Sequence, residues 1–122
     1  MASPSDDLLR FIGSSFRSVW ALELILVLKR ERRVWARDEL VSTMRASELV
    51  VSKAVDALVA AGLASVEGHG VTYMPINDAV AACVDELEKL YAVRPDAVRR
   101  AIVSASATGA TAFAEAFKLR RD

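Results

Sequence analysis

The sequence contains one cysteine, one histidine and no net charge. Each of these features excludes some classes of function. The 122 residues include one cysteine, Cys83, so no internal disulfide can form, and a lone thiol is typical of a reducing compartment such as the cytoplasm. Basic and acidic side chains number 16 each. The overall charge therefore indicates no particular partner.

The same scarcity leaves little for catalysis or metal binding. Nucleophilic catalysis needs a serine or cysteine beside a base, and His69, the single histidine, lies in a predicted turn with no acid to orient it. We interpret Cys83 as a small buried hydrophobe, with a reactive thiol as the alternative. One cysteine and one histidine cannot supply a zinc or iron–sulfur site, and no glycine-rich phosphate loop is present. We expect no catalytic residue, metal site or cofactor.

Long apolar runs are missing as well. The longest run of large apolar side chains, Leu24–Leu28, is far too short to span a bilayer, and the first residues carry acids where a signal peptide needs basic residues. With 53% hydrophobic residues, the chain is expected to be an ordered cytoplasmic protein with no membrane partner. We expect one domain over residues 1–122, with a core at residues 16–75 and a helical extension, a candidate dimer contact, at residues 77–121.

Helical patterns dominate the first half of the chain. A short helix is predicted near Asp6–Phe11, and a second, apolar on nearly every face, from Phe16 to about Arg30. In this second helix the pattern predicts burial of Trp20 together with its aliphatic neighbours. A third helix is expected over Arg37–Met44.

A further helix and a hairpin follow directly. Ser47 is a sound N-cap for a helix that reaches Ala61, and Gly62 a natural C-cap. Two short strands, Leu63–Glu67 and Val71–Met74, are joined by glycines that supply the backbone angles of a tight turn. The order helix, helix, hairpin predicts a mainly α fold with a small β-hairpin wing.

The stretch Val19–Pro75 resembles the winged-helix core of bacterial transcriptional regulators of the MarR type. The residues that carry the resemblance are Ser47, Val51, Ser52, Lys53, Val55, Leu58, the pair Gly62-Leu63 and the hairpin Gly68–Pro75. The resemblance implies a winged helix-turn-helix, here with N-terminal and C-terminal helical extensions. It says little about an operator or a ligand, because winged helices also serve as protein-contact modules.

The C-terminal extension contains a strong apolar stripe. A helix that starts at Asn77 or Asp78 is expected to end before Pro95, where another helix starts, and a last short helix follows. Such stripes must be buried on the core or on a partner. The candidate dimer or partner residues are Val80, Val84, Leu87, Tyr91, Phe113 and Phe117.

Charge near the predicted recognition helix both supports and weakens a DNA hypothesis. The segment Arg32–Arg45 has four arginines against two acids, whereas Ala46–Pro75 has one base against three acids. The arginines of the first segment are suited to phosphate contacts. The side chains of the second segment would have to read the base edges. The DNA-binding candidates are Arg32, Arg33, Arg37, Arg45, Ser47, Glu48, Leu49, Ser52, Lys53 and His69.

Two hypotheses follow from these patterns. The first is a non-enzymatic regulator that binds double-stranded DNA as a homodimer, with two recognition helices one helical turn apart. The second is a winged-helix module that binds another regulator or the transcription machinery without reading DNA. Its surface would be the Leu49/Val50 end of the recognition helix or the C-terminal helices.

Overall fold

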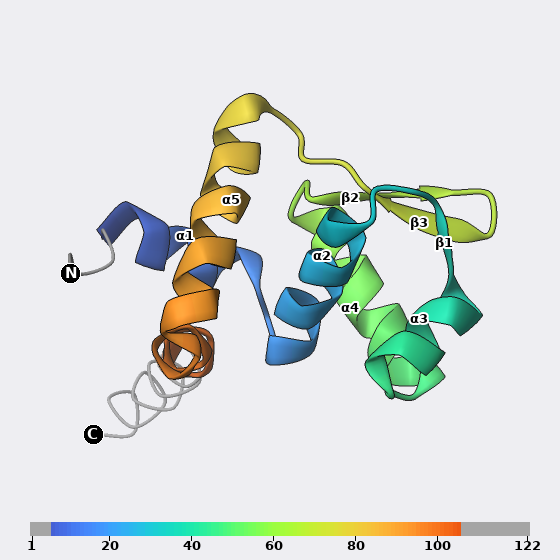
Figure 1. Cartoon of the computed structure of the whole chain (residues 1–122), viewed down its shortest axis with the longest axis horizontal. Coiled ribbons are helices and arrows are strands. Elements are labelled where there is room, and N and C mark those ends of the chain that lie inside the picture. Colours follow the sequence, from blue (N-terminus) through green and yellow to red (C-terminus); the bar gives the residue numbers. More distant parts are fainter. Residues whose placement is uncertain (1–5, 106–122) are drawn as a thin grey trace, which may run out of the picture.

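The chain is mainly helical, with a small three-stranded antiparallel sheet. The computed structural model describes residues 6–105 (Figure 1). Its elements are α1 (Asp6–Ser15), α2 (Val19–Arg30), β1 (Trp35–Ala36), α3 (Arg37–Met44), α4 (Glu48–Ala60), β2 (Ala64–Glu67), β3 (Gly70–Tyr73) and α5 (Asp78–Val93). Residues 95–105 are helical again, after a break at Arg94.

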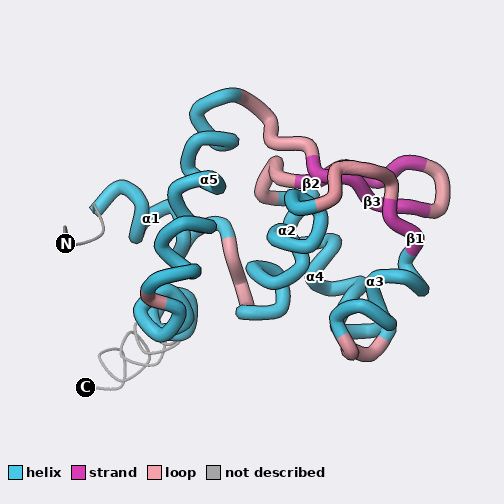
Figure 2. Tube along the Cα trace, in the orientation of Figure 1, coloured by secondary structure: helices cyan, strands magenta, loops and turns pink. Residues whose placement is uncertain are grey.

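Helix α2 is the centre of the fold. It lies between α1 and α5 on one side and α3, α4 and the sheet on the other (Figures 1 and 2). Leu22 and Leu26 are fully buried, as the apolar pattern predicts. The helix begins at Val19 rather than at Phe16, because the Ser18 side chain accepts a hydrogen bond from the Ala21 N–H at 3.3 Å and caps it.

The sheet contains one strand that the sequence pattern does not predict. Strand β3 pairs with both β1 and β2, which gives the order β1-β3-β2. The two-residue β1 lies so close to Gly70 that a Cβ there would be 2.9 Å from the Trp35 carbonyl oxygen. Gly68, with φ of +59°, begins the tight turn of the β2–β3 hairpin. A two-residue strand is too short to leave an alternating pattern in the sequence.

Helices α1 and α5 complete the core on the other side of α2. Leu8 and Ile12 of α1 and Val84 and Leu87 of α5 are buried with the apolar side chains of α2 and α4 in one cluster. Among residues 6–105 no single helix is long and apolar enough to cross a membrane. Helices α1 and α2 reach that length and composition only together, and they are bent by 101° at the break between them.

Candidate nucleic-acid interface

A tight turn orients helix α4 against α3. Arg45 has left-handed backbone angles, with φ of 54°, and its N–H donates to the Val41 carbonyl. Ser47 then caps α4 by accepting a hydrogen bond from the Val50 N–H at 3.1 Å. A left-handed residue followed by a serine cap ends one helix and starts the next within three residues. The two helices are therefore joined by a turn of only three residues.

The two faces of α4 differ in composition as the helical period predicts. Its inner residues, Val51, Ala54, Val55 and Leu58, are at most 3% exposed. Its exposed positions carry charges and two large apolar side chains, Leu49 and Val59. Leu49 is 63% exposed, and Glu48, Lys53 and Asp56 are exposed as well, while Ser52 is half-buried.

Arg37 and Ser52 connect the two helices. The Arg37 guanidinium, at the first position of α3, donates to the Ser52 hydroxyl at 3.4 Å, and both side chains are half-buried. The bond holds α3 against the middle of α4. Because the hydroxyl accepts in this bond, its own proton is free to be donated to a base or a phosphate.

The structure changes the interpretation of Arg33, one of the expected phosphate contacts. Its guanidinium lies 3.9 Å from the centre of the Trp35 ring and pairs with Glu31 at 3.2 Å and with Glu39 at 2.9 Å. Glu39 also accepts from the Ala36 N–H at 2.9 Å, so it caps α3 where the side chain of Ala36 cannot. These bonds, Arg33 first, hold the pKa of Glu39 below its usual value. Arg33 is therefore paired within the fold, and its contact with DNA stays a prediction.

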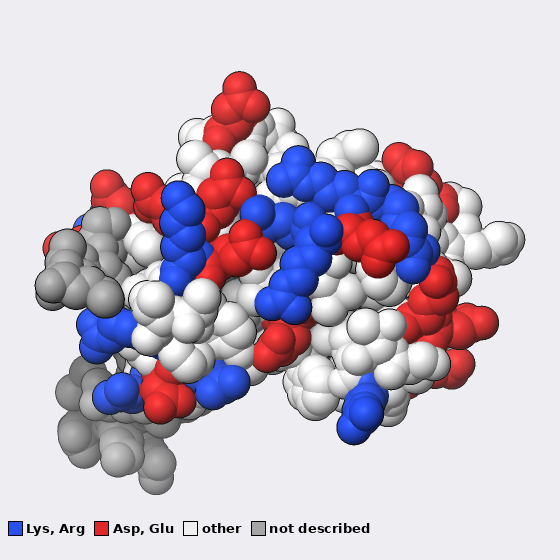
Figure 3. All heavy atoms as spheres, in the orientation of Figure 1, with Lys and Arg blue, Asp and Glu red and all other residues white. Residues whose placement is uncertain are grey.

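Arg32 lies at the sheet. Its guanidinium is 5.1 Å from the centre of the Tyr73 ring on β3, and burial is the main cause of the raised pKa of the Tyr73 hydroxyl. Basic side chains gather over the end of α2 and the chain leading into β1, interrupted by acids (Figure 3). His69 is exposed at the tip of the hairpin. The bases of the candidate set are thus spread over several elements.

The apolar stripe of α5 lies against the chain's own core. Val84 and Leu87 are fully buried, and Val80 and Tyr91 pack against the same cluster. The expectation that these four residues form a partner interface is therefore wrong for Val84 and Leu87, because a helix packed on α1 and α2 has no free stripe there. Cys83 is half-buried beside them. Phe113 and Phe117 lie outside the described residues.

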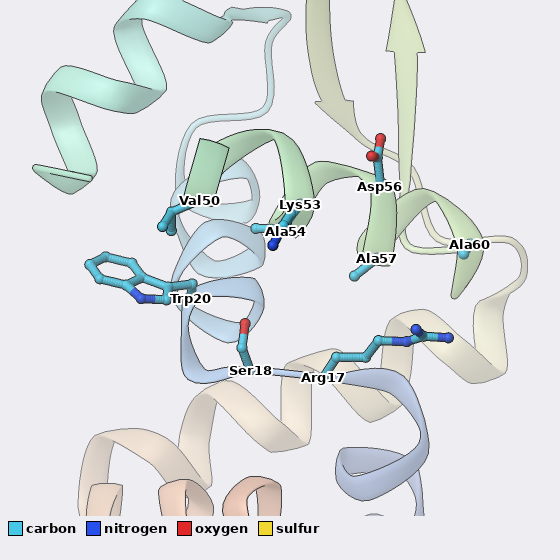
Figure 4. Close-up of a pocket in the computed structure, with 9 residues that line it drawn as sticks. All are labelled: Arg17, Ser18, Trp20, Val50, Lys53, Ala54, Asp56, Ala57 and Ala60. Atoms are coloured by element: carbon cyan, nitrogen blue, oxygen red, sulfur yellow. The ribbon is translucent and has the colours of Figure 1, made fainter. Parts of the chain in front are cut away.

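A cavity beside α4 has no counterpart among the expectations from sequence. It has a volume of about 570 Å³ and lies between the chain entering α2 and the side of α4 that carries Val50, Ala54 and Ala57 (Figure 4). The residues around it are Arg17, Ser18, Trp20, Val50, Lys53, Ala54, Asp56, Ala57 and Ala60. Trp20, predicted to be buried, is 43% exposed at its edge. One signal in the sequence could have indicated an exposed apolar surface here. Helix α2 is apolar on more faces than a single core can bury.

Comparisons with known proteins add no further assignment. No family model matches the chain, and no curated protein or solved structure matches it.

Proposed function

We propose that residues 19–73 form a winged helix-turn-helix that binds double-stranded DNA, with α4 as the recognition helix and the β2–β3 hairpin as the wing. Three observations support this. The elements follow the order helix, strand, helix, helix, hairpin; the strands are ordered β1-β3-β2; and α3 and α4 are joined by a turn of three residues.

The exposed residues of α4 and of the turn before it give the proposal its strongest support. Arg45 and Lys53 are exposed and have no ion pair among residues 6–105, so both are available to phosphates. Leu49, 63% exposed, is suited to a thymine methyl group, and Glu48 to a cytosine amino group. With two cations and two acids near this surface, affinity would depend on base contacts more than on charge.

The test is fluorescence anisotropy of labelled genomic DNA fragments, measured over a range of salt concentrations. The double variant R45Q/K53Q is expected to bind more weakly and to lower the slope of log affinity against log salt by about 0.9 for each phosphate that is no longer neutralised. K89Q is the matched control, because Lys89 is an exposed cation on α5 and should leave both quantities unchanged.

The second candidate function is the binding of a protein partner by the same surface. The exposure of Leu49 and the acids Glu48 and Asp56 favour it, since a partly apolar, acidic helix face suits a protein surface better than a phosphate backbone. The anisotropy experiment separates the two proposals. Absence of DNA binding at low salt contradicts the first and leaves the second.

A further inference from the structure

The cavity beside α4 is elongated along that helix. Its apolar α4 residues recur every three or four positions and so form one side of the helix: Val50, Ala54, Ala57 and Ala60. At a rise of about 1.5 Å per residue they extend over about 15 Å. Trp20 stands at one end, and the Arg17 side chain reaches toward Ala60 at the other (Figure 4). A cavity of this shape is suited to a short helix laid along it.

The apolar wall of the cavity is only partly covered by residues 6–105. Trp20 is 43% exposed, although its α2 neighbours Ala21 and Leu22 are fully buried, and Ala60 is exposed on α4. An exposed indole makes favourable edge or stacked contacts with another aromatic ring, and the one-carbon side chains of the alanines leave room for such a ring. The cavity therefore fits a segment that presents aromatic rings at helical spacing.

A segment with that pattern stands in the same chain, beyond the described residues. Phe113 and Phe117 are four positions apart, the spacing at which two side chains lie on the same side of a helix. Alanines occupy positions 112, 114 and 116 around them, and alanine is the best helix former. Residues 106–111, SATGAT, are small and polar, a composition typical of a connection between elements. The pattern predicts a short helix with two aromatic rings on one side, attached through a connecting segment.

The described part of the chain ends close to the cavity. Ala105 lies against α1, because a Cβ on Gly13 would be 3.1 Å from the Ala105 Cβ. Gly13 precedes Arg17, which lines the cavity, by four residues. Four residues span at most about 14 Å, whereas the eight residues from Ala105 to Phe113 can span up to about 28 Å. The connecting segment is therefore long enough for Phe113 to reach the cavity.

We propose that residues 112–119 of the same chain dock in this cavity as a short helix, with Phe113 and Phe117 against Trp20 and the alanines of α4. A short connection gives the docked segment an effective concentration of roughly millimolar, so it fills the cavity ahead of a free partner of equal affinity.

The docked segment would also regulate the recognition helix. Lys53 lines the cavity and belongs to the proposed DNA surface, so a helix laid beside it competes with DNA for this side of α4. The segment is then autoinhibitory. This consequence, unlike the docking itself, rests on the proposed function.

The test is NMR of the unsubstituted full chain without DNA. Nuclear Overhauser contacts are expected between the Trp20 indole and the rings of Phe113 and Phe117. The chain has four phenylalanines, so the F113A/F117A variant identifies the signals of these two. The Trp35 indole should show no contact with either ring, because it is 7% exposed and its Nε1–H donates to the Glu31 carbonyl at 2.9 Å.

Variants then test both sides of the contact. F113A/F117A should shift the Trp20 indole signal, leave that of Trp35 in place, and make the tryptophan fluorescence more sensitive to quenching by acrylamide. V103A is the matched control, because Val103 is an exposed apolar residue on the helical segment before the connection, and it should change none of these. A57F fills the cavity from α4, where Ala57 is half-buried, and should abolish the contacts of Trp20 with the two phenylalanines.

Anisotropy with labelled DNA measures the autoinhibition. F113A/F117A should bind DNA at least about fivefold more tightly than the unsubstituted chain, the lower end of typical coupling between two sites, and V103A should bind like the unsubstituted chain. Equal DNA affinity for all three proteins would contradict the autoinhibition.

Absence of contacts between Trp20 and the two phenylalanines in the unsubstituted chain would overturn the proposal. Contacts found only between chains, in a mixture of isotope-labelled and unlabelled protein, would also overturn it, because the occupant would then be a second copy. Contacts within one chain in a protein that fails to bind DNA support the docking and contradict only the proposed function. DNA binding without these contacts contradicts only the docking.

Discussion

The two sides of α2 use charge in opposite ways. On the α5 side, Lys29 donates to Glu88 at 2.7 Å and pairs with Asp85 at 3.1 Å, although only 13% of its side chain is exposed. On the α4 side, Arg17 and Lys53 are exposed and have no ion pair among the described residues. Paired charges fix one helix against another, and unpaired charges remain available to a ligand or a phosphate.

A second polar chain strengthens the α5 side. The Tyr91 hydroxyl donates to Glu23 of α2 at 2.7 Å and accepts from Arg99 at 3.1 Å. Burial, followed by the hydrogen bond to Glu23, raises the pKa of Tyr91, so this hydroxyl keeps its proton as a donor. The contacts join α2 to both C-terminal helical segments. The α5 half is therefore built as part of the fold, not as an appendage.

Truncating a buried side chain of α5 is expected to give the largest loss of stability among these tests. L87A should lower the free energy of unfolding by about 2–5 kcal/mol, because Leu87 is fully buried and its truncation leaves a cavity. Urea unfolding followed by circular dichroism measures it. V93A is the control on the same helix, since Val93 is 59% exposed, and should change stability little.

The same variants distinguish the core from a dimer interface. If the α5 stripe were an interface, L87A would change the molecular mass in light scattering and leave the monomer's stability intact. That result would contradict the assignment of Leu87 to the core. We expect a lower stability for L87A than for V93A, with the same molecular mass for both.

Substitution of Lys29, which pairs with Asp85 and Glu88, is expected to give the next largest loss of stability. K29M keeps the apolar stem but leaves Asp85 and Glu88 without their cation, so we expect a loss of about 1–2 kcal/mol, reduced from a fully buried pair because the acids are partly exposed. K89M is the matched control on the exposed surface of α5. A K29M stability equal to that of K89M would show that the pair adds nothing.

The pH dependence of this pair has a definite sign. The hydrogen bond to Glu88, with further help from Asp85, raises the pKa of Lys29 above its usual 10.5. The stabilisation is fully present below the unfolded pKa and is lost as pH rises through the higher folded pKa. The difference between wild type and K29M should therefore be constant near neutrality and shrink in the alkaline range.

Local chemistry makes much of the fold predictable from the sequence. Ser47 and Gly62 delimit α4 through cap preferences that act within a few residues, and the period of α4 identifies Val51 and Leu58 as inner residues. The features that the sequence pattern does not specify depend on contacts between one element and another. The pairing of Arg33 with Glu39, and the direction of the α5 stripe, follow from packing between segments that sequence pattern does not specify.

The candidate site shows the same division. The outer residues of α4 can be named from the helical period, but the cavity cannot, because Arg17 and Trp20 reach it from the start of α2, far earlier in the chain. The apolar pattern of its helix predicts Trp20 in the core. Whether the Trp20 indole is exposed depends on how many faces of α2 the neighbouring elements cover. The sequence pattern does not specify how those elements pack.

The smallest change in stability is expected for the unpaired cations Arg17 and Lys53. It tests whether the two sides of α2 differ in their use of charge. R17Q and K53Q should each change the free energy of unfolding by no more than about 0.5 kcal/mol, the range of exposed substitutions, measured by urea unfolding beside K29M. A larger loss would mean that these side chains support the fold. Unchanged stability would separate the two uses of charge, because an exposed cation without an ion pair adds little to the stability of the fold.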